Sequence, residues 1–120
     1  MNQSLELTQL IEHLTVPAWF VDRDKVLRYV NQAGRAYRPD IEERIGENIE
    51  TCHGPESRAE LRALYDRWQA GSRRVEVRTK ETANGRKFDI YLPVYGPEGF
   101  LGVWELIISV DRKERPGERG

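Results

Sequence analysis

The only cysteine of the chain stands next to one of its two histidines, in a segment where chemistry could take place. Cys52 and His53 lie between Ile45 and Ser57, just before a run of helical periodicity. A cysteine thiolate is a nucleophile that can be oxidised, and a neutral imidazole is a common metal ligand. We therefore expect a functional site in this segment.

The residues that follow have the spacing of an amphipathic helix. Ser57 and Glu60 form the pattern of a capping box, and Gly71 provides a stop. Pro55 lacks an N–H and restricts the residue before it, so the approach to the helix is expected to be a fixed turn. The sequence predicts a helix over 58–69 whose apolar stripe is Leu61, Leu64, Tyr65 and Trp68.

Length and charge limit the classes of protein. A chain of 120 residues can form one domain with its own core, and its net charge of -1 predicts neither nucleic acid nor membrane as a partner. The N-terminus lacks the pattern of a signal peptide, and no apolar run reaches the ~18 residues that cross a bilayer, so we expect the cytoplasm. One cysteine excludes an internal disulfide and a cysteine-rich zinc site.

Helix and strand signals occur in blocks along the chain. Such blocks, without a β–α–β crossover, indicate an α+β fold with helices on one side of a five-stranded antiparallel sheet. Asn31 is expected to cap the short helix that follows it. Besides the helix over 58–69, the expected elements are helices at 4–14, 32–38 and 40–44 and strands at 18–22, 26–30, 73–80, 86–94 and 100–110.

The last two expected strands carry different patterns. In the first, polar residues alternate with Phe88, Ile90, Leu92 and Val94, which we expect to face the core. The last strand is apolar on both faces, interrupted only by Glu105. We expect Trp104 and Leu106 to face inward. The opposite face should be exposed and, with Trp19 and the N-terminal helix, should form a homodimer contact through Leu101, Val103 and Ile107.

The order of these elements resembles that of a PAS domain over about residues 5–111. The resemblance is carried by four short motifs: Phe20 to Asp24, Val26 to Asn31, Ile45-Gly46 and Gly99 to Gly102. It implies a PAS fold over 17–111, preceded by an amphipathic N-terminal helix within 1–16. The charged segment 112–120 is predicted to be a disordered tail.

The stretch from Arg44 to Ser57 is similar to a block of one PAS subgroup, often found beside hemerythrin-like domains. That block reads Arg-Ile-Gly, then Cys-His-Pro-Pro-Lys-Ser, and here Gly54 and Glu56 replace the first proline and the lysine. PAS domains bind a small molecule between the sheet and the central helix, or act without ligand as dimerisation modules. The resemblance therefore implies sensing or signalling, through a partner in another chain. No catalytic triad, carboxylate pair or phosphate-binding glycine loop is found, so we expect no enzyme.

Haem binding is the first of three interpretations of the cysteine–histidine pair. In a set of gas- and redox-sensing PAS proteins, a histidine near the central helix ligates the iron, so the resemblance implies His53 as a candidate axial ligand. Cys52 would lie beside it. The remaining pocket residues would be Leu61, Leu64, Ile90, Trp104 and Leu106.

Two interpretations without haem stay open beside it. Xanthopsin-type photoreceptors, also PAS domains, carry a chromophore on a cysteine in this loop. Here Val30 and Gly34 replace the residues that hold its phenolate, so photoreception is not expected. The other interpretation is structural, with Cys52 as a small buried residue and His53 as a hydrogen-bonding group of the loop. Redox sensing by Cys52 would need exposure and a partner thiol.

Overall fold

One antiparallel sheet organises the chain, in a computed structural model that describes residues 6–111. Its strand order is β2-β1-β5-β4-β3, which confirms the α+β fold expected from the sequence. The tail predicted over 112–120 lies outside the described residues. The strands are β1 (Ala18–Asp22), β2 (Leu27–Val30), β3 (Glu76–Thr82), β4 (Gly85–Gly96) and β5 (Gly99–Asp111).

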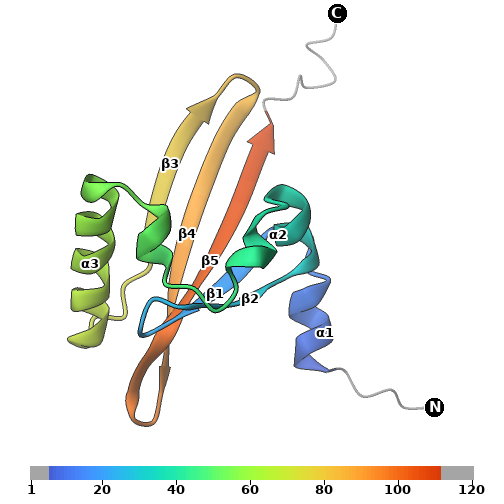
Figure 1. Cartoon of the computed structure of the whole chain (residues 1–120). Helices are drawn as coiled ribbons and strands as arrows, with labels where there is room; N and C mark the ends of the chain where they lie inside the picture. The colour runs from blue at the N-terminus through green and yellow to red at the C-terminus, as the bar shows by residue number, and fades with distance from the viewer. Residues whose placement is uncertain (1–5, 112–120) are drawn as a thin grey trace, which may run out of the picture.

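Short helices connect the hairpin β1–β2 to the long β3–β4–β5 meander. In Figure 1 the η1–η2 segment runs between α3 and α2, and α1 lies beyond α2. No helix within residues 6–111 combines the length and the apolar composition needed to cross a membrane. The helical elements are α1 (Leu7–Glu12), α2 (Gln32–Tyr37), η1 (Ile41–Arg44), η2 (Ile49–Cys52) and α3 (Pro55–Gln69).

Helix α3 begins earlier than the sequence pattern predicts. Pro55 occupies its first turn and Gly54 is the N-cap, so the expected capping box of Ser57 and Glu60 is not the start signal. Proline suits the first helical position because its missing N–H would be unpaired there anyway and its φ is already helical. The helix ends after Gln69, as predicted.

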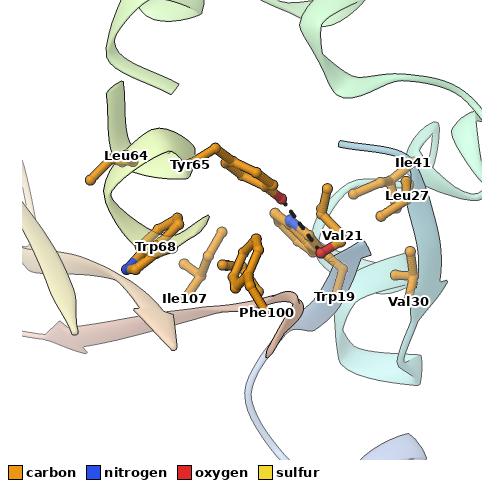
Figure 2. Packing of buried hydrophobic residues seen from close by; sticks show 11 residues of the cluster. Trp19, Val21, Leu27, Val30, Ile41, Leu64, Tyr65, Trp68, Phe100 and Ile107 are labelled. Atoms are coloured by element: carbon orange, nitrogen blue, oxygen red, sulfur yellow. Dashed lines mark hydrogen bonds between the residues drawn. The ribbon is translucent and has the colours of Figure 1, made fainter. Parts of the chain in front are cut away.

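The core lies between α3, η1 and one face of the sheet (Figure 2). Tyr65 and Trp68 of α3 surround Phe100, with ring centroids 5.6 and 6.1 Å from that of Phe100. The Tyr65 hydroxyl donates to the carbonyls of Val21, at 3.4 Å, and Asp22, at 3.2 Å. These contacts fix α3 against β1 and β5.

Asn31 joins the N-terminal segment to the sheet. Its side-chain oxygen accepts from the backbone N–H of Gly34 at 2.8 Å, which confirms the predicted helix cap. The same oxygen accepts from Ala18 N–H at 2.9 Å. Its amide group donates to the carbonyls of Ile11 and Val16, both at 3.0 Å. One buried side chain therefore holds α1, β1 and α2 together.

The structure reverses the faces predicted for β5. Trp19, Val103 and Ile107 are only 6, 3 and 4% exposed and belong to the core, so their expected place on an exposed face is wrong. Of the sheet residues in the expected dimer contact, only Leu101 is exposed. A strand that is apolar on both faces gives no alternation to follow, so the sequence pattern does not decide which face meets the helices. The side chain of Glu105 lines a cavity on the helix-covered face.

The opposite face of the sheet carries the apolar residues that were expected inside. Trp104 pairs with Phe20 of β1 and Leu92 of β4, and residues paired across strands share a face. Its ring lies 5.2 Å from that of Phe20, centroid to centroid. Ile90 and Leu106 are paired with each other on the same face. We call this surface the outer face, defined by Phe20, Ile90, Leu92, Trp104 and Leu106.

Candidate functional site

The segment with Cys52 and His53 is held by its own hydrogen bonds. Cys52 ends the single 3-10 turn η2, and His53 and Gly54 are extended, as expected for a non-helical approach to α3. The Asn48 side chain caps this turn by accepting from the backbone N–H of Glu50 at 2.8 Å. The backbone carbonyl of His53 accepts from Arg58 Nε at 2.9 Å. The histidine is therefore fixed at the entry to α3.

A cavity of about 120 Å³ lies between the η1–η2 segment and the strands β1, β4 and β5. A smaller one, of about 50 Å³, lies next to it under α3. His53, Tyr91 and Glu105 line both, so the two spaces meet at these residues. The wall over the sheet includes Arg38, Arg44, Cys52 and His53, and the floor includes Trp19, Tyr91 and Glu105.

The residues predicted for a ligand pocket divide into two groups. Cys52 and His53 line the larger cavity, and Leu61 and Leu64 line the smaller one. The structure does not bring the others to this site: Ile90, Trp104 and Leu106 belong to the outer face. Cys52 is exposed, contrary to its structural interpretation as a small buried residue.

Glu105 is the main site residue that sequence reasoning missed. Its carboxylate accepts from Trp19 Nε1 at 2.9 Å, and the Tyr91 hydroxyl on the neighbouring strand also donates to it. Burial raises the pKa of Glu105 to about 7, and the nearby Asp89 carboxylate acts in the same direction. One signal in the sequence could have identified it: it is the only charged residue within the apolar run of β5 before Asp111.

Two arginines face this carboxyl group from the opposite wall. Arg44 Nη1 lies 2.9 Å from Cys52 Sγ, and its buried Nε has no hydrogen-bond partner. The nearest carboxylate oxygens, of Asp40 and Glu47, lie 3.8 and 3.9 Å from the Arg44 guanidinium nitrogens, which is too far for a hydrogen bond. Arg38 reaches Asp40 only at 3.7 Å. Both guanidinium groups therefore have donors that no acceptor within residues 6–111 satisfies.

His53 is neutral at pH 7 in this environment. Burial lowers its pKa, and the positive charges of Arg38 and Arg58 lower it further. Within residues 6–111 its ring makes no hydrogen bond, since only its backbone groups are paired. A neutral imidazole offers one donor and one acceptor to a guest. Together, the cavity presents cationic donors on one wall and a protonatable carboxyl on the other.

Several solved structures of other proteins share this fold. A C-terminal domain from Streptococcus mutans aligns at a TM-score of 0.69 with 20% identity, covering 91% of this chain and 92% of that one. A sensory box sensor histidine kinase from Vibrio cholerae aligns at 0.61 and 20%, covering 89 and 90%. The PAS domain of the quorum-sensing receptor RpfR from Cronobacter turicensis, in complex with BDSF, aligns at 0.56 and 16%, covering 83 and 98%.

The family assignment comes from the sequence itself. No curated protein matches the chain. The model of a family described as PAS domain matches residues 7–111, which includes every described helix and strand. The chain belongs to the PAS domain family.

Proposed function

We propose that this PAS domain senses a small molecule held in the cavity beneath the η1–η2 segment. The observation that carries the proposal is a cavity of about 120 Å³ lined by His53, Glu105 and Arg44, the last with a buried Nε that has no hydrogen-bond partner. A concave site with a mostly apolar lining and a few convergent polar groups is the usual form of a small-molecule site. The RpfR domain, which has the same fold, is in complex with BDSF.

A variant that fills the cavity tests this function. Ile49 lines both spaces, so Ile49→Phe should occupy them and prevent binding while keeping the fold. Val77→Phe, at an exposed position of β3, is the matched control. A fragment library is screened by NMR, with the Trp19 indole N–H as reporter. Fragments that perturb this signal in the control but not in Ile49→Phe support the proposal; equal perturbation in both contradicts it.

Haem coordination by His53 stays a prediction, and the geometry favours a smaller guest. The neutral, partly buried imidazole suits an iron ligand. However, the cavity is well below the range of about 300–1,000 Å³ typical of larger ligands. Ile90, Trp104 and Leu106 are also on the wrong face to enclose a porphyrin. The residues present do not fit haem in this arrangement.

An absorption spectrum tests haem directly. A Soret band of the purified protein that is lost in His53→Ala would establish haem binding. A colourless protein that does not take up added haemin would exclude it, and this is the result we expect.

Homodimerisation is the second function that an observation favours. Leu7 and Leu10 of α1 are 82 and 51% exposed. Glu12 of α1 accepts a hydrogen bond from Tyr29, whose ring packs at 6.0 Å against Trp104, so α1 ends beside the outer face. We propose that α1 and the outer face of two copies cover each other, with or without a ligand. This contact replaces the one predicted through Trp19, Val103 and Ile107.

Sedimentation measures this association. We expect a dimer at micromolar concentration that becomes a monomer in Leu10→Arg, whereas Ile45→Arg, at an exposed position directly after η1 on the helix-covered side of the sheet, should leave the dimer unchanged. A wild-type monomer under the same conditions would contradict the proposal.

A cytoplasmic location, a signalling partner in another chain and kinship with the subgroup beside hemerythrin-like domains stay predictions from the sequence.

A further inference from the structure

The chemistry of the cavity indicates the class of ligand, given that the proposed function is correct. We propose that the cavity binds a short-chain monocarboxylate, whose carboxylate oxygens accept hydrogen bonds from Arg44 and Arg38 and whose alkyl tail lies against Leu27, Ile41 and Ile49. All five residues line the larger cavity.

The two arginines on one wall of the cavity are the first reason to expect a carboxylate. The Nε of Arg44 is buried without a partner, and Arg38 has no acceptor within hydrogen-bond distance among residues 6–111. A buried donor without a partner has lost its hydration with no compensation, so an oxygen acceptor that the Arg44 guanidinium turns to meet in the cavity would stabilise it. The planar guanidinium matches the two oxygens of a carboxylate, which favours this anion over a single-point acceptor.

The apolar side of the cavity supports an alkyl tail. Leu27 and Ile41 are buried core residues, and Ile49 of η2 packs against the core to which they belong. They place hydrocarbon beside the arginines, so a ligand with one charged end and one apolar end satisfies both parts. An inorganic anion would leave this apolar side in contact with water only.

Cavity volume limits the length of the acid. At about 30 Å³ for each water-sized group, 120 Å³ holds roughly four non-hydrogen atoms. The adjoining 50 Å³ extends the space to roughly six such atoms. Acetate, propionate and butyrate fit within this limit, whereas an acid with a longer chain would extend beyond the cavity.

Glu105 is the cavity group whose negative charge would most strongly repel a bound anion, and its environment reduces this charge. Burial raises its pKa to about 7, so a large fraction of the carboxyl is neutral at that pH. A bound anion raises this pKa further, so binding takes up a proton and weakens as the pH rises above 7. The charged and titratable groups around it are Arg38, Arg44, Glu47 and His53 at the cavity and Lys87, Asp89 and Tyr91 on β4.

The experiment compares butyrate with butyramide, its neutral isostere, by NMR titration of the Trp19 indole signal. We expect butyrate to bind at least tenfold more tightly than butyramide. Arg44→Gln should remove most of this preference by weakening butyrate binding about tenfold or more. Arg86→Gln is the matched control, because Arg86 pairs with Glu81 near the β3–β4 turn, outside the cavity.

Glu105→Gln provides a change of opposite sign. Removing this acidic group should tighten butyrate binding several-fold at pH 8 and remove most of the pH dependence of the affinity between 7 and 8. A preference for butyrate that Arg44→Gln abolishes and Glu105→Gln strengthens supports the proposal.

Failure of the ligand class is distinguishable from failure of the proposed function. Equal affinity for butyrate and butyramide, or unchanged butyrate affinity in Arg44→Gln, overturns the carboxylate proposal. If neutral fragments still bind in the cavity and Ile49→Phe blocks them, the proposed function stands. If no probe of either kind perturbs the Trp19 signal, both proposals are overturned.

Discussion

The helix-covered face of the sheet contains two regions of opposite character. The aromatic region, formed by Tyr65, Trp68, Tyr95 and Phe100, is filled by rings whose centroids lie 5.6 to 6.1 Å apart. Figure 2 shows Tyr65, Trp68 and Phe100 of this region. The cavity region, formed by Arg44, His53, Tyr91 and Glu105, contains a void and an unpaired guanidinium nitrogen. Both rest on β5, only a few residues apart.

This difference separates stability from function. Filled aromatic packing stabilises the fold, because each ring removes a large apolar area from water. Voids and unpaired polar groups reduce stability, and folds retain them where a site needs them. We therefore expect changes in the aromatic region to affect unfolding, and changes in the cavity region to affect binding and pH response.

The largest effect is expected from Trp68→Ala in the aromatic region. Trp68 is buried and stacks on Phe100, and its indole N–H donates to the carbonyl of Arg74 at 3.0 Å. Its loss should reduce the free energy of unfolding by about 3–5 kcal/mol. Urea denaturation measures this. Trp104→Ala on the half-buried outer face is the control and should cost less; equal losses would contradict the comparison.

Gly102→Ala tests the backbone beneath the same region. Gly102 has φ 152°, and an added Cβ would lie 2.4 Å from the carbonyl oxygen of Val21, which also accepts from Tyr65. The clash and the unfavourable φ should together reduce stability by about 2–3 kcal/mol. Gly71→Ala, with positive φ but open space, isolates the φ effect and should cost about 1 kcal/mol. Similar losses at the two glycines would show that the close approach is unimportant.

The fold and the site differ in how far the sequence predicts them. Alternating strands and turn residues are local signals, so the elements and their α+β arrangement follow from neighbours in the chain. The place of Cys52 and His53 also follows locally, because Pro55 fixes the start of α3. In contrast, the hydrogen bond between Trp19 and Glu105 joins residues 86 positions apart, so no local signal predicts it.

The reversed faces of β5 show why such contacts escape sequence reasoning. With apolar residues on both sides, periodicity defines two faces but not which one meets the helices. The usual assumption that a lone glutamate points to water then selects the wrong face. A buried carboxyl is better understood as a mark of a site, because burial of such a group is tolerated where it has partners or a function.

Glu105→Gln tests the pH response that this carboxyl gives to the cavity region. Its pKa is raised from 4.5 to about 7 on folding, so its contribution to stability is fully present below pH 4.5 and is lost as the pH rises through 7. Between pH 4.5 and 8, the free energy of unfolding of the wild-type protein should therefore fall by up to about 3 kcal/mol relative to that of Glu105→Gln.

The difference between the two proteins isolates this contribution. The pKa of His53 is lowered on folding, so the contribution of His53 to the free energy of unfolding increases as the pH rises toward 6.5. This is opposite to the change expected for Glu105. This contribution is present in both proteins and cancels in the comparison. Urea denaturation at several pH values measures the difference, and parallel curves for the two proteins would show that Glu105 does not titrate in this range.

The smallest effect on stability is expected from Arg44→Gln. The Arg44 side chain is partly exposed, its carboxylate contacts are longer than hydrogen bonds, and its buried Nε is unpaired. Removing it should therefore change the free energy of unfolding by no more than about 0.5 kcal/mol, and the change could be favourable. A loss above about 2 kcal/mol would mean that Arg44 supports the fold. If the free energy of unfolding stays nearly unchanged while butyrate binding weakens, Arg44 serves binding, in contrast to Trp68, which serves stability.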